Sequence, residues 1–275
     1  MIDSHHHLWA YSEAEYSWIP ADTPCRTNFL VPELEAATDS AGVTGTVAVQ
    51  ARQVTAESDA LLAMGRETDR ILGVVGWVPL IDPRVGVELD RLYPEPKFKG
   101  VRHVLQDEPD DYFLRDDFHQ GLSLLPSRDL RYDLLLFQRQ LPVGVQLVDR
   151  QPQLGIIVDH IAKPEVHPGR IEDDWKRGMR ELAERDNIIG VKFSGLATEF
   201  PAGDIDPDTV RAYFHESLEI FGADRLMFGT DWPVALFRLD SYKVWADTVR
   251  DLASSLSPDE RDAVLGGNCK RAYRL

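Results

Sequence analysis

The sequence predicts a (β/α)8 barrel, formed by a single domain that spans residues 1–275. Three observations support this fold class: eight short apolar runs recur along the chain, amphipathic segments separate them, and no glycine-rich turn follows the first run. Alternating strands and helices favour a parallel sheet, and eight repeats in a chain of this length favour closure into a barrel. The alternative is an open doubly wound sheet, which would carry a glycine-rich phosphate turn if it bound a nucleotide after its first strand.

The eight predicted strands are compact blocks of Val, Ile, Leu, Phe or Ala bounded by turn-forming residues. Continuous apolar runs of this kind are typical of strands that are covered on both faces. In chain order the predicted strands are Ile2–His7, Gly45–Gln50, Ile71–Leu80, Lys99–Leu105, Tyr132–Phe137, Gly155–His160, Ile188–Ser194 and Arg225–Asp231.

The segments between these runs carry apolar residues three and four positions apart among many charges, which predicts amphipathic helices. The predicted helices are Val31–Ala41, Ala56–Thr68, Gln138–Arg150, Trp175–Glu184, Asp208–Phe221 and Tyr242–Leu252. A last helix should begin at Pro258, with Ser257 as its N-cap. Two longer polar connections, Asp107–Asp129 and Thr198–Asp208, are candidates for lids or specificity loops above the barrel.

The charge balance excludes several classes of partner. The chain has 30 Lys and Arg against 46 Asp and Glu, a formal charge of −16, and it has no dense basic cluster. Such a surface repels nucleic acid and anionic lipid, and no apolar run approaches the roughly 20 residues that span a bilayer. An acidic start at Asp3 and two widely separated cysteines, Cys25 and Cys269, predict a soluble cytoplasmic protein. We therefore expect a small-molecule substrate and no nucleic-acid or membrane partner; a homo-oligomer is compatible with this composition.

Ionisable residues gather where the predicted strands end, which is where β/α barrels carry their chemistry. His5 and His7 are two residues apart on the first strand, so both should project into the barrel mouth. His160 ends the sixth strand and Asp231 ends the eighth. Three neutral imidazoles and one carboxylate suit a single Zn²⁺ or similar ion. The alternative is that the two histidines of the first strand are hydrogen-bonded core residues without a metal.

Two cations at the same rim are candidates for substrate contacts. Arg102 on the fourth strand and Lys192 on the seventh could bind a carboxylate or a hydroxyl group. The alternative is that each cation pairs with a neighbouring acid such as Asp159 or Asp231. His103 alternates with Arg102 and is expected to face the helices.

Gln50, Trp77 and Trp232, together with Ser194, could supply hydrogen bonds and stacking faces for a sugar ring. The alternative for the two tryptophans is packing, which is their more frequent role at the end of a barrel. Asp159 alternates with His160 and is expected either to support the site from behind or to pair with a helix.

Five blocks of the sequence resemble the amidohydrolase superfamily. Within the superfamily they are most similar to the amidohydrolase 2 branch, which holds sugar-acid lactonases of the L-fuconolactonase and L-rhamnonolactonase types and the 2-pyrone-4,6-dicarboxylate lactonases. The blocks span nearly the whole chain and are Ile2–Trp9, Gly100–His103, Val158–Pro164, Lys192–Leu196 and Arg225–Pro233.

The resemblance implies an enzyme that hydrolyses a sugar-acid lactone by attack of water at the carbonyl. It implies that His5, His7, His160 and Asp231 form the site, that they bind a divalent metal in many members, and that Asp231 shuttles protons. The fourth strand offers Arg102 and the fifth offers no histidine, so a binuclear centre is not expected. Some lactonases of this branch work without a metal, in which case a protonated histidine cluster would act as the electrophile. The alternative functions are a metal-dependent decarboxylase, another amidohydrolase-type hydrolase, a 2-pyrone-4,6-dicarboxylate lactonase, and a barrel retained as a binding protein.

Overall fold

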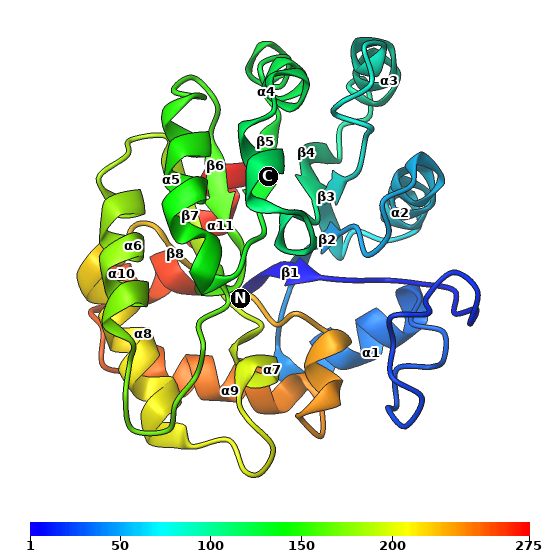
Figure 1. Cartoon of the computed structure of the whole chain (residues 1–275). Helices are drawn as coiled ribbons and strands as arrows, with labels where there is room; N and C mark the ends of the chain where they lie inside the picture. The colour runs from blue at the N-terminus through cyan, green and yellow to red at the C-terminus, as the bar shows by residue number, and fades with distance from the viewer.

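The computed structural model describes residues 1–275 and contains one eight-stranded parallel sheet in the order β1 to β8, surrounded by helices (Figure 1). This arrangement confirms the predicted (β/α)8 barrel. The strands are β1 (Ile2–His6), β2 (Gly45–Val49), β3 (Ile71–Gly76), β4 (Phe98–His103), β5 (Arg131–Leu134), β6 (Ile156–Val158), β7 (Ile188–Phe193) and β8 (Leu226–Phe228).

The barrel closes between its first and last strands through two backbone hydrogen bonds beyond the end of β8. The Asp231 amide donates to the His5 carbonyl at 2.8 Å, and the His7 amide donates to the Trp232 carbonyl at 2.7 Å. Closure at this point brings the end of β1 beside the segment that follows β8, so His5 and His7 meet Asp231.

Eleven α-helices accompany the strands, and all seven predicted ones are present to within a few residues. At the last predicted helix, Ser257 Oγ accepts from the Glu260 amide at 3.4 Å while Glu260 Oε2 accepts from the Ser257 amide at 3.0 Å. The predicted N-cap is therefore a capping box. The helices are α1 (Val31–Ala41), α2 (Thr55–Glu67), α3 (Val85–Leu92), α4 (Asp116–Leu122), α5 (Leu141–Asp149), α6 (Asp173–Ala183), α7 (Leu196–Glu199), α8 (Pro207–Phe221), α9 (Tyr242–Ala253), α10 (Pro258–Asp262) and α11 (Asn268–Tyr273).

The connection Asp107–Asp129 is more ordered than the polar loop that the sequence suggested. It contains α4 and short 3₁₀ turns, and Phe113, Phe118 and Leu122 within it are fully buried. Phe118 and Leu122 are four residues apart and therefore lie on one face of α4. This segment forms a packed helical layer between β4 and β5, and its suggested role as a lid or specificity loop stays a prediction.

Most strands end earlier than predicted, and this difference places the site. The strand ladders stop at His6, Val49, Gly76, Phe193 and Phe228. Polar residues that had been assigned to strand ends therefore lie in the first positions of the connections that follow. A small apolar cluster at the other end joins strand side chains such as Val47 and Met227 to Cys269 and Tyr273 of α11. Both cysteines are buried free thiols, and none of the helices is long and apolar enough to cross a bilayer.

Candidate functional site

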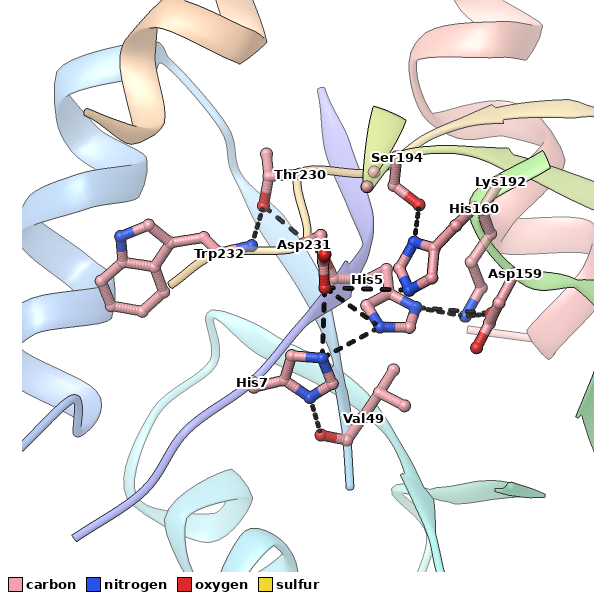
Figure 2. Close-up of polar contacts among 12 residues, drawn as sticks. His5, His7, Val49, Asp159, His160, Lys192, Ser194, Thr230, Asp231 and Trp232 are labelled. Carbon is pink, nitrogen blue, oxygen red and sulfur yellow. Dashed lines mark hydrogen bonds and ion pairs between the residues drawn. The ribbon is translucent and has the colours of Figure 1, made fainter. Parts of the chain in front are cut away.

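The structure brings His5, His7, His160 and Asp231 together at the carboxyl end of the strands (Figure 2). Asp231 Oδ1 lies 3.3 Å from His7 Nε2, 3.8 Å from His5 Nε2 and 3.8 Å from His160 Nε2. The Nε2 atoms of His5 and His7 are 3.2 Å apart. Three imidazole nitrogens therefore converge on one carboxylate oxygen.

Hydrogen bonds behind the rings hold two of these imidazoles in place. His7 Nδ1 is 2.8 Å from the Val49 carbonyl, which can only accept, so the ring carries its proton on Nδ1. The Nε2 atom of His7 faces Asp231 Oδ1. His160 Nδ1 lies 2.8 Å from Ser194 Oγ, which fixes its ring in the same way.

His5 adjoins a buried ionic network, visible on the right of Figure 2. Its Nδ1 atom lies 3.0 Å from Lys192 Nζ and 3.4 Å from Asp159 Oδ1. Arg102 Nη1 lies 3.1 Å from Asp159 Oδ2 and 3.4 Å from His5 Nε2. Asp159 is therefore the shared partner of His5, Lys192 and Arg102, which agrees with its predicted position behind the site.

Burial and charge set the ionisation of the cluster at neutral pH. Burial lowers the pKa of His160 to about 4, although the nearby carboxylates of Asp231 and Asp159 act in the opposite direction. Burial, together with the charge of Lys192, holds the pKa of His5 well below its usual value. Burial would raise the pKa of Asp231, but its interactions with His160 and His7 outweigh that effect and leave the pKa lowered. Asp231 is thus a carboxylate beside the neutral imidazoles of His5 and His160.

Left-handed backbone aims His160 at the cluster. The φ angles of His160, Ile161, Ala162 and Lys163 are 52°, 45°, 59° and 40°. Residues with a β-carbon rarely adopt this conformation consecutively, because the β-carbon crowds the following carbonyl. The turn is held by the Trp175 indole, which donates to the Ile161 carbonyl at 2.8 Å, and by the Lys163 amide, which donates to the His160 carbonyl at 2.9 Å. Strain of this kind is concentrated at functional sites.

His5, His7 and Asp231 fit a single divalent ion by both chemistry and spacing, and His160 Nε2 faces the same Asp231 oxygen at 3.8 Å. Ligands at about 2.0–2.1 Å from a tetrahedral ion stand about 3.3 Å apart, close to the 3.2–3.8 Å separations measured among these atoms. The ligand atoms of His5, His7 and Asp231 all lie within 4.8 Å of one another. The neutral imidazoles of His5 and His160 and the ionised Asp231 are the forms that bind a metal.

A cavity of about 800 Å³ opens over this cluster. His7, His160, Asp231 and Arg102 line it, so four of the predicted site residues face the space where a substrate would bind. His5 is completely buried beneath them.

The structure does not bring Lys192, Gln50, Trp77 or Trp232 to the cavity wall. Lys192 is fully buried in ion pairs with Asp133 and Asp159, the alternative that the sequence left open. The Gln50 amide donates to the Arg102 carbonyl at 3.3 Å.

The two tryptophans pack within the protein. The indole N–H of Trp77 lies 3.3 Å from His103 Nδ1, and Trp232 packs edge-on against Phe29. His103 stacks on Tyr112 and lies 3.0 Å from Glu108, as expected for a residue that faces the helices.

Several cavity residues were not predicted from the sequence. They come from the connections that follow the strands and are Trp18, Arg52, Gln53, Gln106, Lys163 and Glu199. Two of them carried a signal: Lys163 follows His160 by three residues in a matching sequence block, and Glu199 lies in the connection Thr198–Asp208 that was expected to form a lid or specificity loop. The others lie in segments whose path over the barrel depends on packing between distant parts of the chain.

The eight-stranded barrel and the three-histidine, one-aspartate cluster at its carboxyl end define a class of barrel proteins equipped to hold a divalent ion beside a cavity. The amidohydrolase family matches residues 2–275, and the chain belongs to that family.

Two relatives from Burkholderia are similar over the whole chain. An L-fucono-1,5-lactonase from Burkholderia multivorans is 34% identical, covering 100% of this chain and 96% of that protein. An L-fucono-1,5-lactonase from Burkholderia ambifaria is also 34% identical, covering 100% and 95%. A crystal structure of an amidohydrolase from Burkholderia multivorans with bound Zn superimposes with a TM-score of 0.93 at 35% identity, covering 100% of this chain and 99% of that one.

Proposed function

We propose that this protein is a lactonase that opens a sugar-acid lactone, such as fuconolactone or rhamnonolactone, by attack of water at the lactone carbonyl. The observation that carries the proposal is an ionised Asp231 held among three imidazoles on the wall of an accessible cavity. The similarity to two proteins named L-fucono-1,5-lactonase supports a sugar-acid lactone as the substrate.

Asp231 is suited to act first as a base and then as an acid. Its carboxylate takes a proton from water as the water oxygen bonds to the carbonyl carbon. When the bond between that carbon and the ring oxygen breaks, the protonated Asp231 returns the proton to the departing alkoxide. The product is a hydroxy acid, and its carboxylate would lie near the guanidinium of Arg102, which lines the same cavity.

His5, His7, His160 and Asp231 would hold the divalent ion, and we propose Zn²⁺ as its identity. When bound there, such an ion would supply Lewis-acid chemistry, which lowers the pKa of a coordinated water to ~7 and polarises a carbonyl oxygen. The protein's own contribution is orientation: the Val49 carbonyl and Ser194 Oγ fix the rings of His7 and His160 so that their Nε2 atoms face Asp231.

A panel of aldonolactones tests this proposal with a pH indicator, together with elemental analysis of the purified protein. The protein should release acid from an aldonolactone without releasing CO₂. It should contain about one divalent ion per chain, and chelation should reduce turnover. Asp231→Asn should lower kcat by about 100-fold or more, because proton transfer by a positioned side chain contributes ~10²–10⁴-fold.

Glu13→Gln is a suitable control, because Glu13 is an exposed acid whose only ion pair is with Arg26. This variant removes one carboxylate and should leave kcat unchanged. Release of CO₂ in place of lactone hydrolysis would identify a decarboxylase and contradict the proposal. Near-normal kcat in Asp231→Asn would contradict the role of Asp231.

A further inference from the structure

Lys163 and Glu199 stand between two cavities, and the proposed proton transfers use neither residue. The cavity over the histidine cluster measures about 800 Å³, and a neighbouring cavity beside α5 and α6 measures about 740 Å³. Lys163 and Glu199 are the two residues that line both. They therefore form the polar part of the wall that a substrate above Asp231 would meet on that side.

Lys163 is held in a small polar cluster. Its Nζ atom lies 3.1 Å from Gln106 Oε1 and 3.3 Å from Glu199 Oε1, and it sits 4.6 Å above the ring of Phe137. Thr198 Oγ1 contacts the same Glu199 oxygen at 3.4 Å. The side chains of Lys163 and Glu199 are only 18% and 16% exposed, so the pair is largely withdrawn from solvent.

The position of this cluster is tied to the histidine cluster by the left-handed turn. His160 begins that turn and Lys163 ends it, with the Lys163 amide donating to the His160 carbonyl at 2.9 Å. The Gln138 amide donates to the Lys163 carbonyl at 3.3 Å. One rigid turn therefore carries both a residue of the histidine cluster and the ammonium group on the cavity wall.

We propose that Lys163, Gln106 and Glu199 form a subsite that recognises two neighbouring hydroxyl groups of the lactone ring. This inference rests on the proposed lactonase function. It names the residues that would make the enzyme prefer polyhydroxylated lactones. One hydroxyl oxygen accepts from Lys163 Nζ, and the other hydroxyl donates to the Glu199 carboxylate, so the diol bridges the pair. A lactone without hydroxyl groups offers neither Lys163 nor Glu199 a hydrogen bond in place of the water that its ring displaces.

The burial of Glu199 supports this assignment. Burial raises the pKa of the Glu199 carboxyl despite the opposing effect of Lys163 beside it. A buried carboxylate with few hydrogen-bond donors gains from a substrate hydroxyl that donates to it. Sites built to bind a hydroxyl group discriminate strongly against analogues that lack it, because their own polar groups are then left unpaired.

The test compares two substrates across two variants. We would measure kcat/KM for L-fucono-1,5-lactone and for δ-valerolactone, which has the same six-membered ring and no hydroxyl groups, with wild type, Lys163→Met and Glu199→Gln. The variants should lose about 10- to 100-fold on the hydroxylated lactone and less than about 3-fold on δ-valerolactone. Equal losses on both substrates, or no loss on either, would overturn the subsite. Glu165→Gln is the matched control, because Glu165 lines only the neighbouring cavity, and both substrates should keep their wild-type values.

A binding measurement separates this inference from the proposed function. Calorimetry with the lactams of the same two rings, L-fucono-1,5-lactam and 2-piperidone, reports recognition without turnover. Lys163→Met and Glu199→Gln should weaken binding of the hydroxylated lactam about 10-fold or more, whether or not the wild type hydrolyses either lactone. Unchanged lactam binding in both variants would overturn the subsite, whereas wild-type protein that hydrolyses no lactone would contradict only the proposed function.

Discussion

The ammonium group of Lys192 lies 2.5 Å from Asp133 Oδ2 and 2.8 Å from Asp159 Oδ1, with no exposed surface on any of the three side chains. Burial would lower the pKa of Lys192, but the two carboxylates outweigh that effect and raise it. The hydroxyl of Tyr273 donates to Asp133, which links this network to α11. Lys192 therefore connects the candidate site to the opposite end of the barrel.

Lys192→Met should destabilise the protein because it leaves two buried carboxylates without their shared cation. Removing one partner of a buried ion pair costs about 3–5 kcal/mol. Urea unfolding should show a loss of this size, and adding Asp133→Asn should recover part of it. Lys243→Met is the matched control, since Lys243 pairs with Asp247 on the surface and such pairs contribute only about 0–1 kcal/mol. Equal losses in the two lysine variants would contradict this account.

The residues of the candidate site and of the ionic network beside it could be predicted from the sequence to very different degrees. His5, His7, His160 and Asp231 follow from the strand pattern and the position of strand ends, since all parallel strands carry their carboxyl ends at one rim. Lys192 was expected at the same rim as a substrate contact. Its burial depends on Asp133, which lies 59 residues away in the sequence and gives no local signal.

At the scale of elements, the segment after β7 packs against the turn between β6 and α6, which carries His160. Gly195, which follows Ser194 after β7, has a φ angle of 66° and packs against the His160 ring. A β-carbon at Gly195 would lie 2.6 Å from His160 Nδ1. Only glycine allows both the left-handed backbone and the close approach of the imidazole at this position.

Gly195→Ala should therefore displace the His160 ring and lower kcat by about 10-fold or more, because small misplacements of a catalytic geometry are costly. Lactone hydrolysis under steady-state conditions would measure the loss. Gly42→Ala separates displacement of the ring from backbone strain. Gly42 has the same φ angle of 66° and no neighbouring atom within 4 Å of an added β-carbon. This control should lose stability with unchanged kcat, and an equal fall in kcat in both variants would show that His160 is not the cause.

The elements themselves were predictable where their own sequence specifies them. Helix α1 has its predicted bounds because apolar periodicity and Pro32 near its start act locally. The left-handed turn at His160 was not predictable. Non-glycine residues favour right-handed backbone, and the turn exists because tertiary contacts such as that of Trp175 hold it. Strand ends were predicted too late for a related reason: barrel geometry ends the ladder, and residues just beyond it, such as Gln50 and Ser194, carry no local signal for that point.

At the scale of the whole molecule, the loops that follow β1 and β2 are joined beside the cavity by one buried acid. Glu57 of α2 accepts from the backbone amides of Ala51 and Arg52 at 2.9 and 2.6 Å, and the Tyr16 hydroxyl lies 3.5 Å away. Arg52 in turn pairs with Glu15 at 2.6 Å. The net charge of −16 thus coexists with a cavity wall that carries a paired acid and base, Glu15 and Arg52.

Glu57 should make stability depend on pH in a direction that its environment sets. Burial raises its pKa to about 7 despite the hydrogen bonds from Arg52 and Ala51, whereas in the unfolded chain its pKa is near the usual value of 4.5 for a glutamate. The folded state therefore keeps the proton over a range in which the unfolded state has lost it. The contribution of Glu57 to stability is complete below pH 4.5 and is lost as the pH rises through about 7.

Glu57→Gln isolates this effect because glutamine does not titrate. At about 1.4 kcal/mol per pH unit, the unfolding free energy of the variant relative to wild type should rise by roughly 2–3 kcal/mol between pH 5 and pH 8. Urea unfolding of both proteins at the two pH values measures this difference, and histidines common to both proteins cancel from it.

Glu15→Gln is the control. Glu15 is an exposed partner of Arg52, and its hydrogen bond with Arg52 lowers the pKa of the Glu15 carboxyl. The difference of this variant from wild type should not change over this range, since Glu15 is ionised in both folded and unfolded states. A pH-independent difference for Glu57→Gln would mean that Glu57 is ionised in the folded protein across the whole range, with the amides of Ala51 and Arg52 and the Arg52 side chain sufficient to offset its burial.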